Sequence, residues 1–138
     1  MRLRDKRMMT MKAVVTTLAL MLAAAPAVAE PFVLLIYETP DQIALRDDKG
    51  AAGAAYWGAV AEFGKAATEA GILRGGAAMV PVPVAVARTA ERPGGLVLGG
   101  FFQIDVADSA TAAEWAGKIP AAATGAVEVR ATVAAPGM

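Results

Sequence analysis

Polar side chains alternate with an aromatic ring in one apolar segment of the chain, and they are the first candidates for chemistry. Phe101, Gln103 and Asp105 stand two residues apart, so in a β-strand they share one face. A carboxylate on a covered face loses part of its hydration, which favours a role in proton transfer. Tyr37 ends an earlier apolar segment and adds a hydroxyl to the same face. These four residues form the predicted ligand-binding site, and no residue is assigned a catalytic role.

Each of these residues also has a purely structural interpretation. Asp105 can lie in water at the strand end, while Gln103 bonds a partner chain. Tyr37 can bury its ring and leave its hydroxyl at the rim of the core. Three functions therefore stay open: a dimeric small-molecule-binding protein, an isomerase or lyase that uses Asp105 for proton transfer, and an envelope module that binds another protein.

The composition excludes many other sites. The 138 residues include no histidine and no cysteine, which removes the commonest general base and metal ligand, thiol nucleophiles and disulfides. The remaining carboxylates are scattered, so no metal site and no cofactor are predicted. With 13 Lys plus Arg against 13 Asp plus Glu, the chain has no basic excess that indicates nucleic acid.

The segments that must position the candidate residues predict the order β-α-β-β-α-β. Proline confines one strand-like segment to a sheet edge, because proline lacks the donor that a central strand needs. The predicted elements are a strand over 32–37, a loop over 41–50, a helix over 51–70 ended by Gly71, an edge segment within 72–88, a strand over 96–106, a helix from an N-cap at Ser109 to about residue 118, and a strand from 126 to about 132.

This order predicts a ferredoxin-like α+β fold with an antiparallel sheet in the order 4-1-3-2 and both helices on one face. Strands one and three are then central, and they are the most apolar strands of the chain. In the third strand, alternation places Leu98 with Gly100 on the core face and Val97 with Phe101 on the other. Two helices cover only one face, so we expect a second copy to cover the other in a homodimer.

The N-terminal 29 residues have the three parts of a signal peptide. A basic stretch leads into an uncharged apolar run over 13–25, and Pro26 precedes the small residues 27–29. We therefore expect cleavage before Glu30, a periplasmic or secreted location, and no stable membrane anchor afterwards. Met1, Met8, Met9 and Met11 all remain possible starts. Cleavage leaves 109 residues with 8 Lys plus Arg against 12 Asp plus Glu, a net charge of −4. We expect these residues to form one domain over 30–133 and a disordered tail over 134–138.

Several stretches resemble the YCII-related family, also called the DGPF-domain family, over most of 32–133. The clearest are Leu-Gly-Gly-Phe-Phe-Gln-Ile-Asp-Val at 98–106, Ala-Ala-Glu-Trp-Ala at 112–116, Ile-Pro-Ala at 119–121 and Val-Glu-Val-Arg at 127–130. The resemblance implies a dimeric α+β barrel. The Asp-Gly-Pro-Phe motif is absent, since Arg-Pro-Gly-Gly stands at 92–95. The His and Asp pair proposed as catalytic in some relatives has no counterpart in a chain without histidine.

Overall fold

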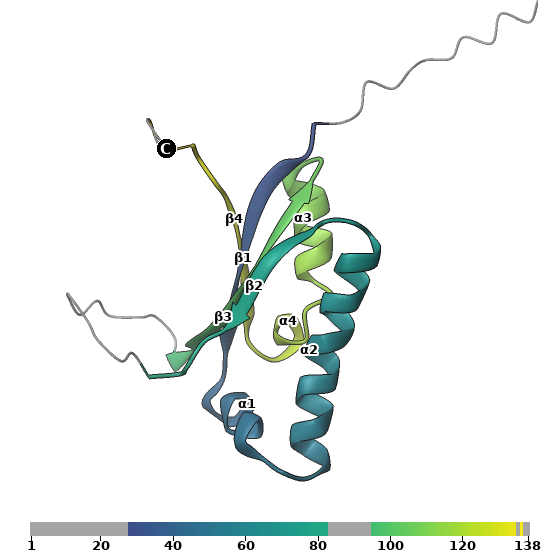
Figure 1. Ribbon diagram of the computed structural model, residues 1–138. Helices are drawn as coiled ribbons and strands as arrows, with labels where there is room; N and C mark the ends of the chain where they lie inside the picture. Colours follow the sequence, from purple (N-terminus) through teal and green to yellow (C-terminus); the bar gives the residue numbers. More distant parts are fainter. Residues whose placement is uncertain (1–27, 83–94, 135, 137–138) are drawn as a thin grey trace, which may run out of the picture.

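A computed structural model describes residues 28–82, 95–134 and 136 (Figure 1). Residues 1–27, 83–94, 135 and 137–138 lie outside the described residues. They include most of the predicted signal peptide, part of the predicted proline-bearing edge segment and most of the predicted tail. The elements are β1 (Glu30–Glu38), α1 (Pro40–Ala44), the 3-10 turn η1 (Leu45–Asp47), α2 (Ala51–Glu69), β2 (Leu73–Ala78), β3 (Val97–Val106), α3 (Ser109–Ala116), α4 (Ala121–Thr124) and β4 (Ala126–Ala131).

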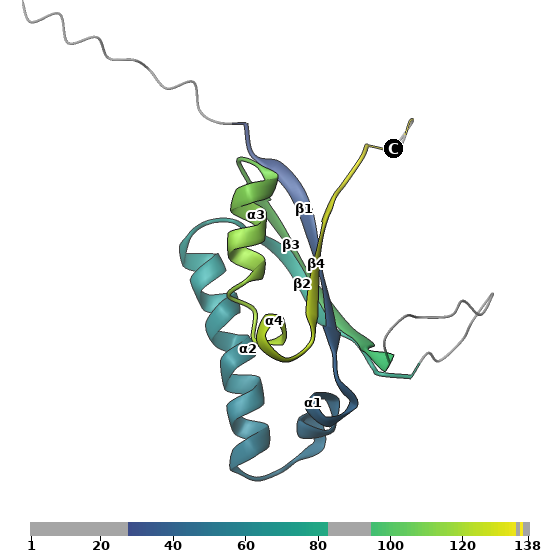
Figure 2. The same cartoon turned by 180° about the vertical axis from the view of Figure 1, so that it is seen from behind.

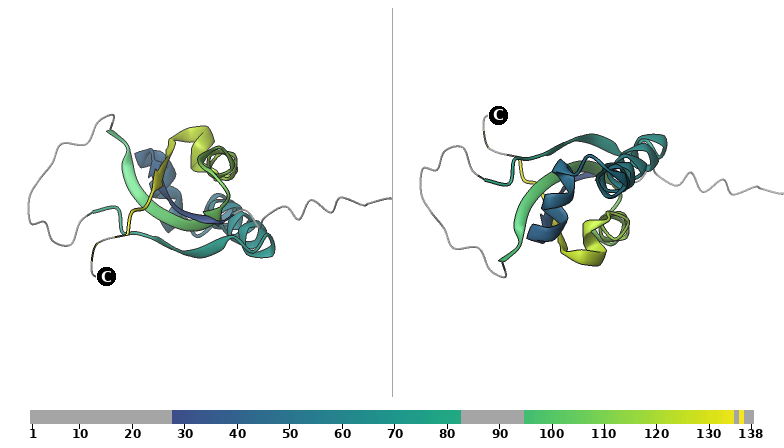
Figure 3. Two further views of the ribbon diagram at one scale, coloured as in Figure 1. Left: turned by 90° about the horizontal axis from the view of Figure 1, so that it is seen from above. Right: turned by 90° about the horizontal axis from the view of Figure 1, so that it is seen from below.

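The four strands form one antiparallel sheet in the order β2-β3-β1-β4. This confirms the predicted α+β fold and strand order, with the two most apolar strands in the centre. The helices α2, α3 and α4 lie on one side of the sheet (Figures 1 and 2). Seen end-on, the twisted sheet curves around α3 and α4 (Figure 3). In the described part of the chain no helix covers the other face, which we call the open face.

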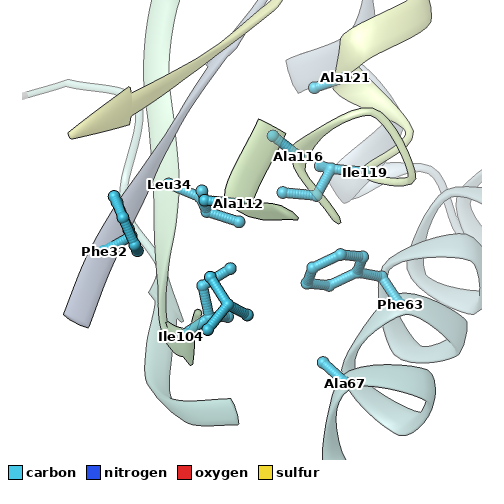
Figure 4. Packing of buried hydrophobic residues seen from close by; sticks show 10 residues of the cluster. Phe32, Leu34, Phe63, Ala67, Ile104, Ala112, Ala116, Ile119 and Ala121 are labelled. Atoms are coloured by element: carbon cyan, nitrogen blue, oxygen red, sulfur yellow. The ribbon is translucent and has the colours of Figure 1, made fainter. Parts of the chain in front are cut away.

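The core lies between the helix-facing side of the sheet and the helices. Leu34 of β1 and Ile104 of β3 are fully buried, and they point toward Phe63 of α2 (Figure 4). The ring of Phe63 packs against Phe102 with ring centroids 4.7 Å apart. The remaining buried apolar side chains of this core are Phe32, Ala67, Val106, Ala112, Ala116, Ile119 and Ala121.

Helix α2 forms as its spacing predicts, because apolar residues recur every three or four positions along one face. Phe63 and Ala67 on that face are buried, whereas Tyr56 and Val60 are half-buried. Gly71 ends the helix region with φ of 71°, a left-handed conformation that glycine adopts without a steric penalty.

Three details of the predicted elements are wrong. The segment 41–50 was predicted as a loop, but its residues 41–47 belong to α1 and η1, and only 48–50 lie outside helices. The helix starts here because Thr39 accepts a hydrogen bond from the Gln42 N–H and Pro40 suits the first helical turn. The N-cap of α3 is Asp108, whose carboxylate accepts from the Thr111 N–H, and not Ser109. Helix α4 lies in a segment that was assigned no element.

The predicted faces are also wrong at the start of β3. Ile36 pairs with Gly100, but Tyr37 pairs with Leu98, so one residue of β3 is extra at this point. Such a bulge reverses the side-chain alternation beyond it. Leu98 therefore shares the open face with Tyr37, and Val97 lies opposite Glu38 on the helix-facing side.

Two glycines of α2 are expected to respond oppositely to alanine. A Cβ at Gly58 meets nothing within 4 Å, so Gly58→Ala is expected to raise the free energy of unfolding by about 0.5–1 kcal/mol. A Cβ at Gly53 meets the Asp48 carbonyl oxygen at 2.0 Å, so Gly53→Ala is expected to cost about 1–3 kcal/mol. Urea denaturation measures both, and a shift of both midpoints in one direction contradicts this packing.

Candidate functional site

A cavity of about 260 Å³, partly open to solvent, lies between the helix-facing side of the sheet and α2. Its lining is mainly apolar, and the side chains of Ile36, Val60, Phe63 and Phe102 contribute to it. The other lining residues are Glu38, Gln42, Arg46, Tyr56, Trp57, Gly76, Ala77, Ala78, Gly99, Gly100, Ile119, Pro120, Ala121 and Thr124.

Small residues explain why this space is left unfilled. The end of β2 has the sequence Gly-Gly-Ala-Ala at 75–78, and β3 carries Gly99 and Gly100 beside it. At the other end of the same strands Leu73 and Ile104 fill the corresponding space with large side chains. The cavity therefore follows from a change of residue size along two paired strands.

The polar residues at the cavity form one cluster of Glu38, Arg46 and Tyr56, which we call the polar cluster. The Tyr56 hydroxyl donates to Glu38 Oε1 at 2.5 Å, and Arg46 Nη2 donates to Glu38 Oε2 at 2.5 Å. Arg46 Nε donates to the Tyr56 hydroxyl oxygen at 2.8 Å. Each side chain thus contacts the other two, which fixes all three against the cavity wall.

Different elements bring the polar cluster together. Glu38 ends β1 on the face of Leu34 and Ile36, Arg46 belongs to η1, and Tyr56 lies in the second turn of α2. Arg46 also donates to the carbonyl oxygens of Met79 at 2.8 Å and Gly99 at 2.8 Å. The guanidinium therefore ties the end of β2 and the start of β3 to the chain that connects β1 with α2.

Gly99 is required for this close approach. A Cβ at this position lies 2.0 Å from Glu38 Oε2 and 2.6 Å from Arg46 Nη2. Any side chain here displaces the ion pair from the strand. Glycine at 99 consequently serves the polar cluster as well as the cavity.

The charges of the polar cluster balance within a poorly hydrated site. The side chains of Glu38 and Arg46 are 6% and 12% exposed, and they form an ion pair. Burial raises the pKa of Tyr56 to about 12, and the hydrogen bond that its hydroxyl donates to Glu38 acts in the same direction, whereas Arg46 lowers it. Tyr56 is therefore a neutral hydrogen-bond donor at neutral pH.

The raised pKa predicts a late titration of Tyr56. The chain has two tyrosines, so phenolate absorbance is expected to show one transition near pH 12 that Tyr56→Phe removes and Tyr37→Phe retains. Because the folded pKa exceeds the ordinary value of about 10, this stabilising contribution is intact below pH 10 and is lost as the pH rises toward 12. A late transition that survives in Tyr56→Phe contradicts the assignment.

The four residues predicted as the site lie on the open face, away from this cavity. Phe101 pairs with Leu35, and Gln103 pairs with Val33, so they share one surface with Tyr37. Tyr37, Phe101 and Asp105 are half-buried, and Gln103 is exposed. The Asp105 carboxylate forms an ion pair with Arg74 at 2.8 Å. The structure thus brings the four residues to one face, and their role in binding stays a prediction.

The sequence-based interpretation did not identify Glu38, Arg46 and Tyr56 as a group. Tyr56 falls within the helix predicted over 51–70, and Glu38 follows the strand predicted over 32–37, so neither is among the predicted site residues. One usable signal was present, since Glu38 follows Phe32, Leu34 and Ile36 at the two-residue spacing of a buried face. A carboxylate in that position needs a buried partner.

Among the described residues, no group of three or more His, Cys, Asp or Glu side chains could hold a metal ion. No helix within 28–82 or 95–134 is long and apolar enough to cross a membrane.

Fold and cavity together define a ferredoxin-like α+β domain with a side-chain-lined cavity between its sheet and its longest helix. The family model of the YCII-related domain matches residues 31–134. The chain belongs to the YCII-related family, as the resemblance of its strands indicated. No curated protein matches the sequence at a significant level.

Proposed function

We propose that this YCII-related domain binds a small, largely apolar molecule in the cavity between the sheet and α2. One observation carries the proposal: a partly open cavity with mainly apolar walls contains a single polar cluster of fixed geometry. This combination is typical of ligand sites, in which apolar walls supply affinity and a few polar groups fix orientation.

The size of the cavity limits the ligand. Its volume of about 260 Å³ lies just below the range of roughly 300–1,000 Å³ that holds drug-sized ligands. A molecule with one substituted ring fits this volume better than a nucleotide or an extended lipid.

The geometry favours binding over the proton-transfer alternative at Asp105. That carboxylate is paired with Arg74 on the open face, whereas the cavity lies on the helix-facing side. In the polar cluster, the one carboxylate of the described lining, Glu38, forms an ion pair with Arg46, which stabilises its charged form and weakens it as a base.

Homodimerisation and export belong to the same proposal. The open face carries half-buried Val33, Leu35 and Phe101 in register, which supports pairing with a second copy through this face. Strand β1 begins at Glu30, so cleavage there leaves the described fold intact. We therefore propose that the protein is an exported homodimer with one ligand-binding cavity in each chain.

Filling the cavity tests the proposal. Val60→Phe places a ring in the cavity from α2, while Ala61→Phe adds the same ring at an exposed position of that helix. With toluene as the probe, the amide NMR signals of Gly76, Gly99 and Gly100 are expected to shift in the wild type and in Ala61→Phe. They are expected to stay unchanged in Val60→Phe. A lack of shifts in the wild type contradicts the proposed site.

A further inference from the structure

The polar cluster also indicates the chemical class of the ligand. We infer that the cavity binds an uncharged molecule with a hydrogen-bond donor, such as a phenol or an alcohol, and excludes carboxylates. This inference rests on the proposed function. The inference is carried by one juxtaposition at the cavity wall. The buried carboxylate of Glu38 lies beside Arg46, whose guanidinium already donates hydrogen bonds to other groups of the protein.

Arg46 has too few free donors to bind an anion. A guanidinium has five N–H groups, and it recognises a carboxylate best through two parallel ones. Four of the five already donate, to the Tyr56 hydroxyl, the Met79 and Gly99 carbonyls and Glu38 Oε2. At most one N–H remains for a ligand, so a two-point contact with a carboxylate cannot form without breaking the polar cluster.

Glu38 disfavours the binding of anionic ligands and favours ligands that donate a hydrogen bond. Each of its oxygens accepts one hydrogen bond within the polar cluster, although each has a second lone pair. An incoming hydroxyl can donate to that free position. An incoming carboxylate instead places a like charge beside Glu38 in a site with little water, which is unfavourable.

A cationic ligand is disfavoured for a complementary reason. The guanidinium of Arg46 lies 5.6 Å from the ring centroid of Tyr56 and 5.7 Å from that of Trp57, so it already occupies these aromatic surfaces. Its charge already neutralises Glu38. A second cation finds no unbalanced negative charge among the described lining residues.

Two further lining residues suit a neutral polar group. Gln42 provides an amide and Thr124 provides a hydroxyl, and both groups donate as well as accept. In the described part of the lining, Glu38 is therefore the acidic group, Arg46 the basic one, and the other polar side chains are neutral.

A matched pair of probes tests the inference. At pH 7, 4-methylphenol is neutral because phenols titrate near pH 10, whereas 4-methylbenzoate is ionised. In NMR titrations of the full domain, the phenol is expected to bind at least about tenfold more tightly. Equal binding, or tighter binding of the benzoate, overturns the inference while the toluene shifts still support the proposed function. If neither probe nor toluene binds, both are overturned.

A charge-removing variant gives a second, independent readout. In Glu38→Gln the positive charge of Arg46 is no longer balanced, so the preference is expected to move toward 4-methylbenzoate by about tenfold or more. Glu114→Gln at an exposed position of α3 makes the same change of charge away from the cavity and is expected to keep the wild-type ratio. An unchanged ratio in folded Glu38→Gln overturns the inference, and the wild-type comparison decides it alone if that variant does not fold.

Discussion

Replacing Arg46 with Met is expected to lower the free energy of unfolding by about 3–5 kcal/mol. The substitution leaves the Glu38 carboxylate 6% exposed and without a counter-charge, and it removes the donors to the Met79 and Gly99 carbonyls. Domains of this size are stabilised by only about 5–15 kcal/mol, so the loss is a large part of the total. Urea denaturation followed by circular dichroism measures it.

Two control variants distinguish the effect of a buried ion pair from that of a solvent-exposed ion pair. Lys65 and Glu69 form an ion pair 3.8 Å apart with side chains 77% and 68% exposed, so Lys65→Met is expected to cost less than about 1 kcal/mol. The double variant Glu38→Leu with Arg46→Met removes both charges and is expected to recover a substantial part of the loss. Similar costs for Arg46→Met and Lys65→Met contradict a buried polar cluster.

Replacing Leu35 with Lys is expected to convert the proposed dimer to a monomer. Leu35 lies in the middle of β1 on the open face and pairs with Phe101, so in the dimer a lysine there loses its hydration without gaining a partner. Sedimentation velocity is expected to show a dimer for the wild type and a monomer for the variant. Ala113→Lys on the exposed side of α3 is the matched control and is expected to stay dimeric.

The same variant separates the two candidate sites. The described cavity is lined by residues of one chain, so monomeric Leu35→Lys is expected to retain the toluene shifts at Gly99 and Gly100. A ligand held between sheet and partner by Tyr37, Phe101, Gln103 and Asp105 is lost instead. A dimeric Leu35→Lys contradicts the role of the open face.

The fold was predictable from the sequence because its determinants are local. The two most apolar strands lie at the centre of the sheet and the alternating strand at one edge, as predicted, and the spacing from Tyr56 to Ala67 defines α2. The other edge is β2, which ends at Ala78, so the described part of the proline-bearing segment follows the edge strand instead of forming it. Helix α1 escaped prediction because it is only 5 residues long and depends on the Thr39 cap. The bulge at the start of β3 depends on pairing with β1, which no local pattern reveals.

The cavity was not predictable, because it depends on contacts between distant residues. Arg46 and Gly99 are 53 residues apart, and their hydrogen bond forms only when β3 packs beside η1. The glycines and alanines of β2 indicate from the sequence that this strand contributes few large side chains to the core. Whether they leave a cavity depends on how α2 packs across the sheet. The open face was predicted because alternation along one strand is local, which explains why the sequence pointed to that face first.

Native mass spectrometry tests the central claim most directly, with the full chain expressed and purified from the exported fraction. We expect a dimer of chains that begin at Glu30, each with a small additional mass that Val60→Phe lacks and Ala61→Phe retains. A dimer without additional mass, or a mass that Val60→Phe still carries, contradicts ligand binding in the cavity between the sheet and α2.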